Sequence, residues 1–151
     1  MPEQETIERA REDEREGKSP STQAGEFVRE EIEHVREGKH GARSTKQAIA
    51  IGLSKARRAG VKLRTPARGK TSEETGRKAK RDSERGRSRR RSKPSAKRSR
   101  AIKSALKREG RSAASSTDLS RHAKSSARSR SRKLRSAAAK KAAATRARRR
   151  G

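Results

Sequence analysis

Charge of opposite sign occupies the two ends of this 151-residue chain. Residues 1–40 hold 12 Asp and Glu against 7 Lys and Arg, whereas residues 41–151 hold 39 Lys and Arg against 6 Asp and Glu. The net charges are therefore −5 and +33. A positive excess of this size repels itself in a compact fold, and it predicts a polyanionic partner, most often a nucleic acid.

The low apolar content limits how much of the chain can pack. Only 25% of the residues are hydrophobic, and Phe27 is the single aromatic residue. Burial of so few apolar side chains does not offset a chain entropy of roughly 1–2 kcal/mol per residue over the full length. We therefore expect a mostly α-helical protein with extensive disorder. The expected parts are an acidic polar helix in 1–18, a helical hairpin in 19–66, and a disordered or conditionally helical tail in 67–151 with marginal helices, rich in Arg, Lys, Ser and Ala.

The first helix is expected to be solvated or frayed rather than packed, because Ile7 is its only large apolar residue. Its acidic charge suggests that it folds back on the basic tail as an intramolecular competitor for the polyanion.

The hairpin is the one segment whose pattern predicts a core. Ser19 with Pro20 is typical of a helix start, and Ser44 followed by Gln47 is a capping-box pattern at the start of a second helix. The run from Gly38 to Gly41 is expected to end the first helix, and Gly60 the second. Gly52 would let the two backbones approach closely. Because this core is small, we expect the hairpin to be marginal alone and to form a homodimer or dock on a protein partner. Its expected core residues are Phe27, Val28, Ile32, Val35, Ile49 and Leu53.

Two strings in the hairpin resemble a known family. They are Lys39-His40-Gly41 and Lys46-Gln47-Ala48-Ile49-Ala50-Ile51-Gly52-Leu53-Ser54. The family consists of small basic bacterial proteins and is catalogued only as a domain of unknown function. The resemblance covers roughly 26–63 and implies a bacterial, cytosolic protein with no assigned activity. The tail is similar in composition to the tails of histone-H1-like nucleoid proteins, although it has 30 Arg to 16 Lys, and those tails are rich in lysine and proline.

Phosphate binding is the chemistry that the basic segment predicts. Each Lys or Arg that neutralises a phosphate releases counterions, which gives a salt slope of about −0.9 per duplex contact. The basic segment has no aromatic residue to stack on bases, so we expect contacts to phosphate backbones without sequence preference, as in DNA compaction or nucleoid association. The expected contacts are Arg57, Arg58, Arg85, Arg87, Arg89, Arg90, Arg91, Lys93, Lys97, Arg98, Arg100, Lys103, Lys107, Arg108, Arg128, Arg130, Arg132, Lys133, Arg135, Lys140, Lys141, Arg146, Arg148, Arg149 and Arg150.

Other kinds of site have weaker support in the sequence. There is no cysteine, and His34, His40 and His122 are too scattered along the chain to predict a metal site. The paired acids Glu30-Glu31 and Glu73-Glu74 are expected to be helix-start or surface carboxylates and not catalytic dyads. Without a Gly-rich phosphate loop, a nucleophile elbow or triad spacing, we expect no enzyme and no cofactor.

Alternative functions remain open at this point. The hairpin could be a protein-interaction module that the tail tethers to nucleic acid or ribosomes, the chain could bind RNA, or it could be a disordered stress protectant. No apolar run approaches the ~20 residues of a membrane span, so we expect no membrane partner and a cytoplasmic, nucleoid location.

Overall fold

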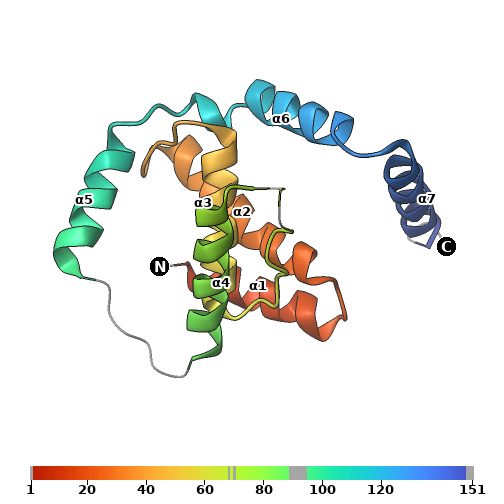
Figure 1. Ribbon diagram of the computed structural model, residues 1–151, viewed down its shortest axis with the longest axis horizontal. Coiled ribbons are helices and arrows are strands. Elements are labelled where there is room, and N and C mark those ends of the chain that lie inside the picture. The colour runs from red at the N-terminus through yellow and green to blue at the C-terminus, as the bar shows by residue number, and fades with distance from the viewer. Residues whose placement is uncertain (1, 68, 70, 89–94, 149–151) are drawn as a thin grey trace. The chain divides into compact units, whose positions relative to one another are not determined.

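The structure is a computed structural model that describes residues 2–67, 69, 71–88 and 95–148 (Figure 1). Over these residues the chain is mostly α-helical, as predicted, and contains no strand. The elements are α1 (Gln4–Arg15), α2 (Pro20–Glu37), α3 (Thr45–Ala59), α4 (Glu73–Arg87), α5 (Ala96–Lys107), the short 3-10 helix η1 (Ser112–Ala114), α6 (Ser116–Arg128) and α7 (Arg132–Arg148).

Extensive disorder is not what the structure shows for the described part of 67–151. Four α-helices and η1 occupy most of it. Alanine, arginine and lysine are among the strongest helix formers, and they dominate the composition of α5 and α7. Local propensity therefore gives helices even where few apolar side chains are available for burial.

Two compact units make up the chain, residues 1–115 and residues 116–151. The first unit contains α1 to α5 and η1, and the second contains α6 and α7. The boundaries expected from composition, after residues 18 and 66, fall inside the first unit, where α1 packs on α2 and α4 packs on α3.

Capping side chains and glycines define the α2–α3 hairpin as the sequence predicts. Ser19 and Ser44 each accept a hydrogen bond from the backbone N–H three residues further on. Gly38 and Gly60 end the two helices in the left-handed conformation, with φ of 78° and 105°. These φ values suit glycine, which has no Cβ to clash with the backbone.

The expected hairpin residues form much of the core. Phe27, Ile32 and Val35 are buried, and Val28, Ile49 and Leu53 are partly buried. Small side chains complete this core, notably Ala24 and Ala56, which cluster with Phe27. Apolar packing in this protein thus depends on close helix approach more than on large side chains.

The prediction of a solvated first helix is wrong. Ala10 of α1 is buried in the Phe27 cluster, and Ile7 packs against it. Arg9 adds an ion pair across to Glu26 of α2, with Nε 2.8 Å from Oε2. Ala10 makes the apolar contact between α1 and α2 that large side chains were expected to be needed for. A helix face of small residues carries little hydrophobic area, but it lets the two helices pack closely.

Part of the expected tail packs on the turn of the hairpin. The backbone N–H of Gly41 donates to the carbonyl of Leu106 at 2.9 Å, and the Thr45 hydroxyl donates to the carbonyl of Ala113 at 2.6 Å. Ala113 and Ala114 are buried there. The hairpin therefore receives cover from α1, from α4 and from residues 106–114 of its own chain.

Replacement of Gly52 by alanine is expected to destabilise the first unit by about 1–3 kcal/mol, as overpacking does in well-packed cores. A Cβ at this position of α3 would lie 2.7 Å from the Cα of Val28 on α2. Gly25 of α2 is the matched control, because a Cβ there meets nothing within 4 Å. Gly25→Ala should gain up to about 1 kcal/mol through helix propensity. Urea unfolding followed by circular dichroism measures both, and equal effects of the two substitutions would contradict the close approach of α2 and α3.

Candidate nucleic-acid interface

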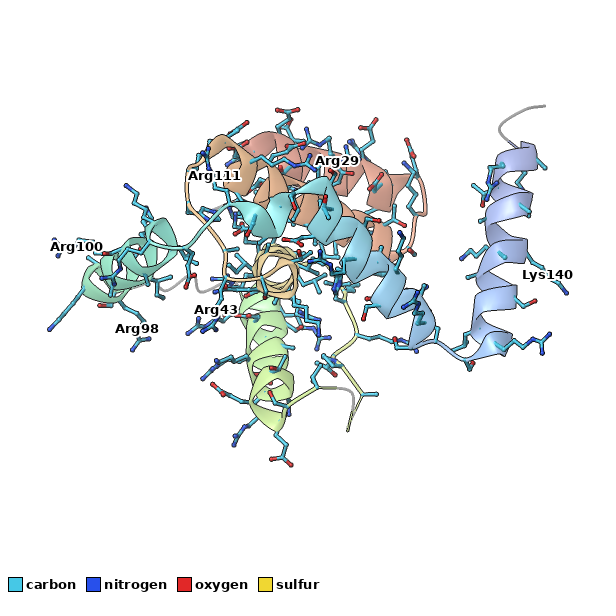
Figure 2. The ribbon with its side chains drawn as sticks, turned by 90° about the horizontal axis from the view of Figure 1, so that it is seen from above. Arg29, Arg43, Arg98, Arg100, Arg111 and Lys140 are labelled. Carbon is cyan, nitrogen blue, oxygen red and sulfur yellow. The ribbon has the colours of Figure 1, made fainter. Side chains whose placement is uncertain are left out.

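Two exposed helices carry the least compensated positive charge. The sequence of α5 has five Lys and Arg and that of α7 has seven, and neither helix contains an acidic residue. No described residue of either helix is buried. Figure 2 shows Arg98 and Arg100 pointing away from α5, and Lys140 pointing away from α7. α5 belongs to the first unit and α7 to the second.

Most of the expected phosphate contacts are exposed. The side chains of Arg89, Arg90, Arg91, Lys93, Lys133, Arg135, Arg149 and Arg150 lie outside the part of the chain that the structure describes. The exposed ones are Arg58, Arg85, Arg87, Lys97, Arg98, Arg100, Lys103, Lys107, Arg108, Arg128, Arg130, Arg132, Lys140, Lys141, Arg146 and Arg148.

Arg57 is the exception among the expected contacts. Only 8% of this residue is exposed, and its guanidinium donates to the backbone carbonyl of Arg64 at 3.4 Å. Burial lowers the pKa of Arg57, and attraction from Asp82 of α4 offsets this only in part. Gly86 of α4 packs directly on the Arg57 carbonyl, because a Cβ there would lie 2.0 Å from this oxygen. Arg57 therefore belongs to the α3–α4 contact and not to a phosphate-binding surface.

Arg58 is exposed but already has an intramolecular role. Its Nε lies 3.7 Å from an Asp82 carboxylate oxygen and donates to the backbone carbonyl of Ser54. A terminal nitrogen of the same guanidinium donates to the Ser54 hydroxyl. The Ser54 hydroxyl in turn donates to Asp82. These contacts join α3 to α4, so Arg58 has less freedom to meet a phosphate than the cations of α5 and α7.

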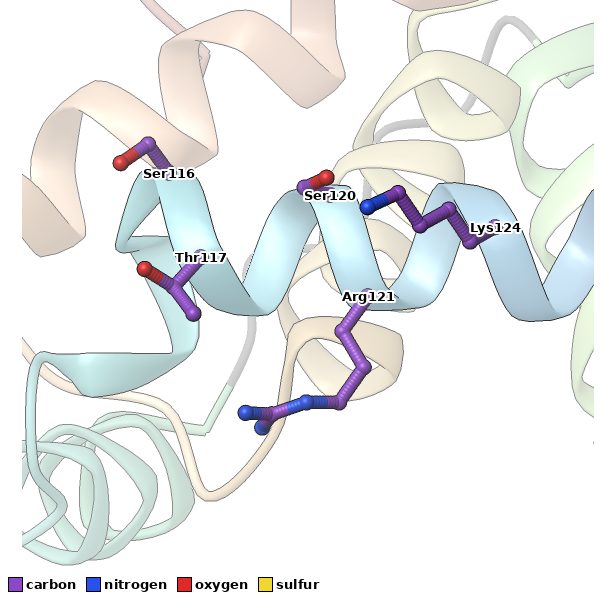
Figure 3. A pocket seen from close by; sticks show the side chains of 5 residues that line it. All are labelled: Ser116, Thr117, Ser120, Arg121 and Lys124. Carbon is purple, nitrogen blue, oxygen red and sulfur yellow. The ribbon is translucent and has the colours of Figure 1, made fainter.

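One basic face that was not predicted from the sequence lies on α6. Arg121 and Lys124 line a shallow hollow of the second unit together with three hydroxyl-bearing residues (Figure 3). Arg121 also pairs with Asp118, at 2.7 Å. The signal was present in the spacing, because residues 117, 120, 121 and 124 share one face of a helix. The lining residues are Ser116, Thr117, Ser120, Arg121 and Lys124.

The paired acids of α2 are not surface carboxylates, in contrast to the prediction from the sequence. Glu30 and Glu31 are 2% and 0% exposed. Lys55 of α3 reaches both, with Nζ 2.8 Å from a Glu30 oxygen and 2.7 Å from a Glu31 oxygen. Burial opposes ionisation of Glu30, but hydrogen bonds from Lys55 and from the Glu3 backbone N–H outweigh it, so the pKa of Glu30 is lowered. Burial likewise opposes the charge of Lys55, and the two carboxylates more than offset it, so the pKa of Lys55 is raised.

No helix in the described part of the chain is both long enough and apolar enough to cross a bilayer.

A family described as a family of unknown function (DUF6496) matches residues 19–69. The match covers about a third of the chain and contains α2, α3 and the segment that follows them. It extends beyond the 26–63 expected from the two strings of the hairpin. No curated protein and no solved structure matches the chain. Over its hairpin the chain is therefore similar to an uncharacterised family, and the basic helices lie outside the matched residues.

Proposed function

We propose that the protein binds nucleic acid without sequence preference, through contacts of its basic helices with phosphate groups. The observation that carries the proposal is the composition of α5 and α7, twelve cations on exposed helices with no acidic residue among them. Cations that lack an internal partner gain most from a polyanion, because each phosphate contact releases condensed counterions. DNA compaction or nucleoid association is the role we propose for this binding.

Few groups suited to base recognition accompany these cations. Neither α5 nor α7 contains Asn, Gln or an aromatic residue. Adenine is read by bidentate Asn or Gln contacts, and stacking on single strands requires aromatic rings, so arginine to guanine is the main base contact that these helices offer. Arginine binds phosphate equally well through two N–H groups. The basic helices therefore support contacts to the backbone of duplex DNA or structured RNA.

Removal of three cations from α7 is expected to reduce the salt dependence of binding. In the triple variant Lys140→Gln, Lys141→Gln and Arg148→Gln, the slope of log K against log salt should fall in magnitude by up to about 2.7, at about 0.9 per lost duplex contact. Titration of a 30-base-pair duplex with the full chain, over a series of salt concentrations, measures this slope.

A matched control removes the same charge from the acidic end of the chain. Arg11→Gln, Arg15→Gln and Arg29→Gln replace three exposed cations of α1 and α2. This triple variant should keep the slope of the original protein. Equal loss of slope in both triple variants would show that only net charge matters, and absence of any salt-dependent binding would disprove the proposal. Parallel titrations with duplexes of different sequence, single strands and double-stranded RNA decide which polyanion is preferred.

A further inference from the structure

Three side chains with metal-binding atoms meet at the turn of the hairpin. Glu31 and His34 lie on α2, and His40 lies in the turn that follows it. One ligand atom from each falls within 4.8 Å of the others. The His34 and His40 rings stand edge to face, with centroids 6.0 Å apart. These histidines are scattered along the sequence, but the left-handed Gly38 reverses the chain and returns His40 to the end of α2.

The hydrogen bonding of His40 leaves one ring nitrogen facing a carboxylate. Its Nδ1 lies 3.1 Å from the backbone carbonyl of Gly41, which can only accept, so Nδ1 carries the proton. In the neutral imidazole Nε2 is then a lone-pair acceptor. This Nε2 lies 3.3 Å from Oε1 of Glu31. Two acceptors that face each other require either a second proton on the ring or a cation between them.

Glu31 Oε1 is short of donors on its other sides. It is fully buried and accepts no hydrogen bond. Lys55 contacts the other oxygen, Oε2. A buried carboxylate oxygen without a hydrogen-bond donor costs free energy, which a bound cation would recover.

The distance between the two acceptors matches that of two ligands on one metal ion. Zinc–nitrogen and zinc–oxygen bonds of about 2.0–2.1 Å in a tetrahedral arrangement place neighbouring ligand atoms about 3.3 Å apart. The Nδ1–H donated to a backbone carbonyl is also the second contact that metal-binding histidines commonly make. A ligand atom of the partly buried His34 ring lies within 4.8 Å of these two acceptors, which makes it the third candidate ligand.

Charge in this cluster favours a divalent cation. Four carboxylates share two ammonium groups, because Lys55 pairs with Glu30 and Glu31 while Lys39 pairs with Glu3 and Glu37. With neutral imidazoles the formal charge of this set is therefore −2, and it is −1 when Arg111, whose guanidinium lies against Gly38, is included. The Glu3 carboxylate also contacts Nε2 of His34, at 2.9 Å, so it is placed to supply a fourth ligand.

We propose that Glu31, His34 and His40 bind a divalent transition-metal ion of the zinc class, with Glu3 or water in the fourth position. Two imidazoles and one carboxylate are a donor set that zinc and its neighbours bind, whereas magnesium and calcium prefer oxygen ligands alone. This site is independent of the proposed phosphate contacts, since it uses no cation of α5 or α7. Bound metal would fix the turn against the end of α2.

Zinc titration of the untagged, metal-stripped full chain tests the site. Isothermal calorimetry should show one high-affinity Zn²⁺ per chain, and His34→Gln or His40→Gln should weaken it at least about tenfold. His122 of α6 is the matched control, because it is the only other histidine and lies in the second unit. His122→Gln should bind Zn²⁺ as the original protein does.

A second measurement needs no substitution and so does not depend on the folding of a variant. The chain has three histidines, whose ring C–H signals can be followed by nuclear magnetic resonance during the titration. Zn²⁺ should shift two of them at one equivalent and leave the third unchanged. Absence of saturable binding, binding that survives both the His34 and His40 substitutions, or equal shifts of all three histidines would overturn the proposal.

Discussion

Replacement of Lys55 by methionine is expected to lower the free energy of unfolding by about 3–5 kcal/mol. Methionine keeps an unbranched apolar stem of similar length but removes the ammonium that contacts Glu30 and Glu31. Two buried carboxylates would then lack their counter-charge, and loss of one partner of a buried ion pair typically costs this much. Because a whole domain is stable by only about 5–15 kcal/mol, the thermal midpoint should fall by roughly 10–20 °C.

Lys46 provides the control for this experiment. It lies on the same helix and is exposed, so Lys46→Met should change the stability by no more than about 0.5 kcal/mol. Thermal unfolding monitored by circular dichroism measures both variants. If Lys55→Met were no more harmful than Lys46→Met, Lys55 would not be what stabilises the buried carboxylates.

Lower pH should reduce the difference in thermal midpoint between the original protein and the Lys55→Met variant. Since the folded-state pKa of Glu30 is lowered, its carboxylate stabilises the original protein fully above the ordinary value of about 4.5. That stability is lost as the pH falls through the folded pKa. In Lys55→Met the unpaired carboxylates are relieved by protonation instead. The difference in thermal midpoint should therefore shrink from pH 7 to about pH 4, and a constant difference would contradict the ion-pair explanation.

Replacement of Gly41 by alanine is expected to release residues 106–114 from the hairpin turn. A Cβ on Gly41 would lie 1.9 Å from the backbone carbonyl oxygen of Glu109, a separation that no side-chain adjustment relieves. Overpacking of about 1–3 kcal/mol is expected, and the hydrogen bonds from Gly41 and Ala42 to this segment would weaken with it. Amide hydrogen exchange at Ala42, whose N–H donates to the carbonyl of Gly110, should speed up by about five- to a hundredfold.

Gly110 gives the matched control from the other side of the same contact. A Cβ on Gly110 meets nothing within 4 Å, so Gly110→Ala should leave exchange at Ala42 unchanged. Similar exchange rates in the two variants would show that residues 106–114 do not pack on the turn as described.

The hairpin could be predicted because its signals are local. Ser19, Ser44, Gly38 and Gly60 each act on the backbone within a few residues, and each cap lies where the pattern indicates. The spacing of Phe27, Ile32 and Val35 likewise depends only on helical periodicity. Such features follow from the chain itself, without knowledge of what packs against it.

Contacts between distant segments could not be predicted from the sequence, because the residues that make them are small or charged. Ala10, Gly86 and Ala113 look ordinary in a low-complexity chain, yet each lies at a contact between segments far apart in sequence. Burial of Glu30 and Glu31 follows from the same cause, since it requires Lys55 to arrive from another helix. Among the expected phosphate contacts in the described part of the chain, exposure agreed with composition except at Arg57, where α4 covers the end of α3.

Anchorage at its C-terminal end distinguishes α5 from a free tail. The carbonyl of Leu106, in the last turn of this helix, accepts from the backbone N–H of Gly41, and the carbonyl of Gly110 just beyond it accepts from Ala42. A polyanion that engages the cations of α5 therefore meets a helix that is attached to the turn of the hairpin. Such attachment limits how far these cations reach, which favours contact with phosphates close to the first unit over contact with distant ones.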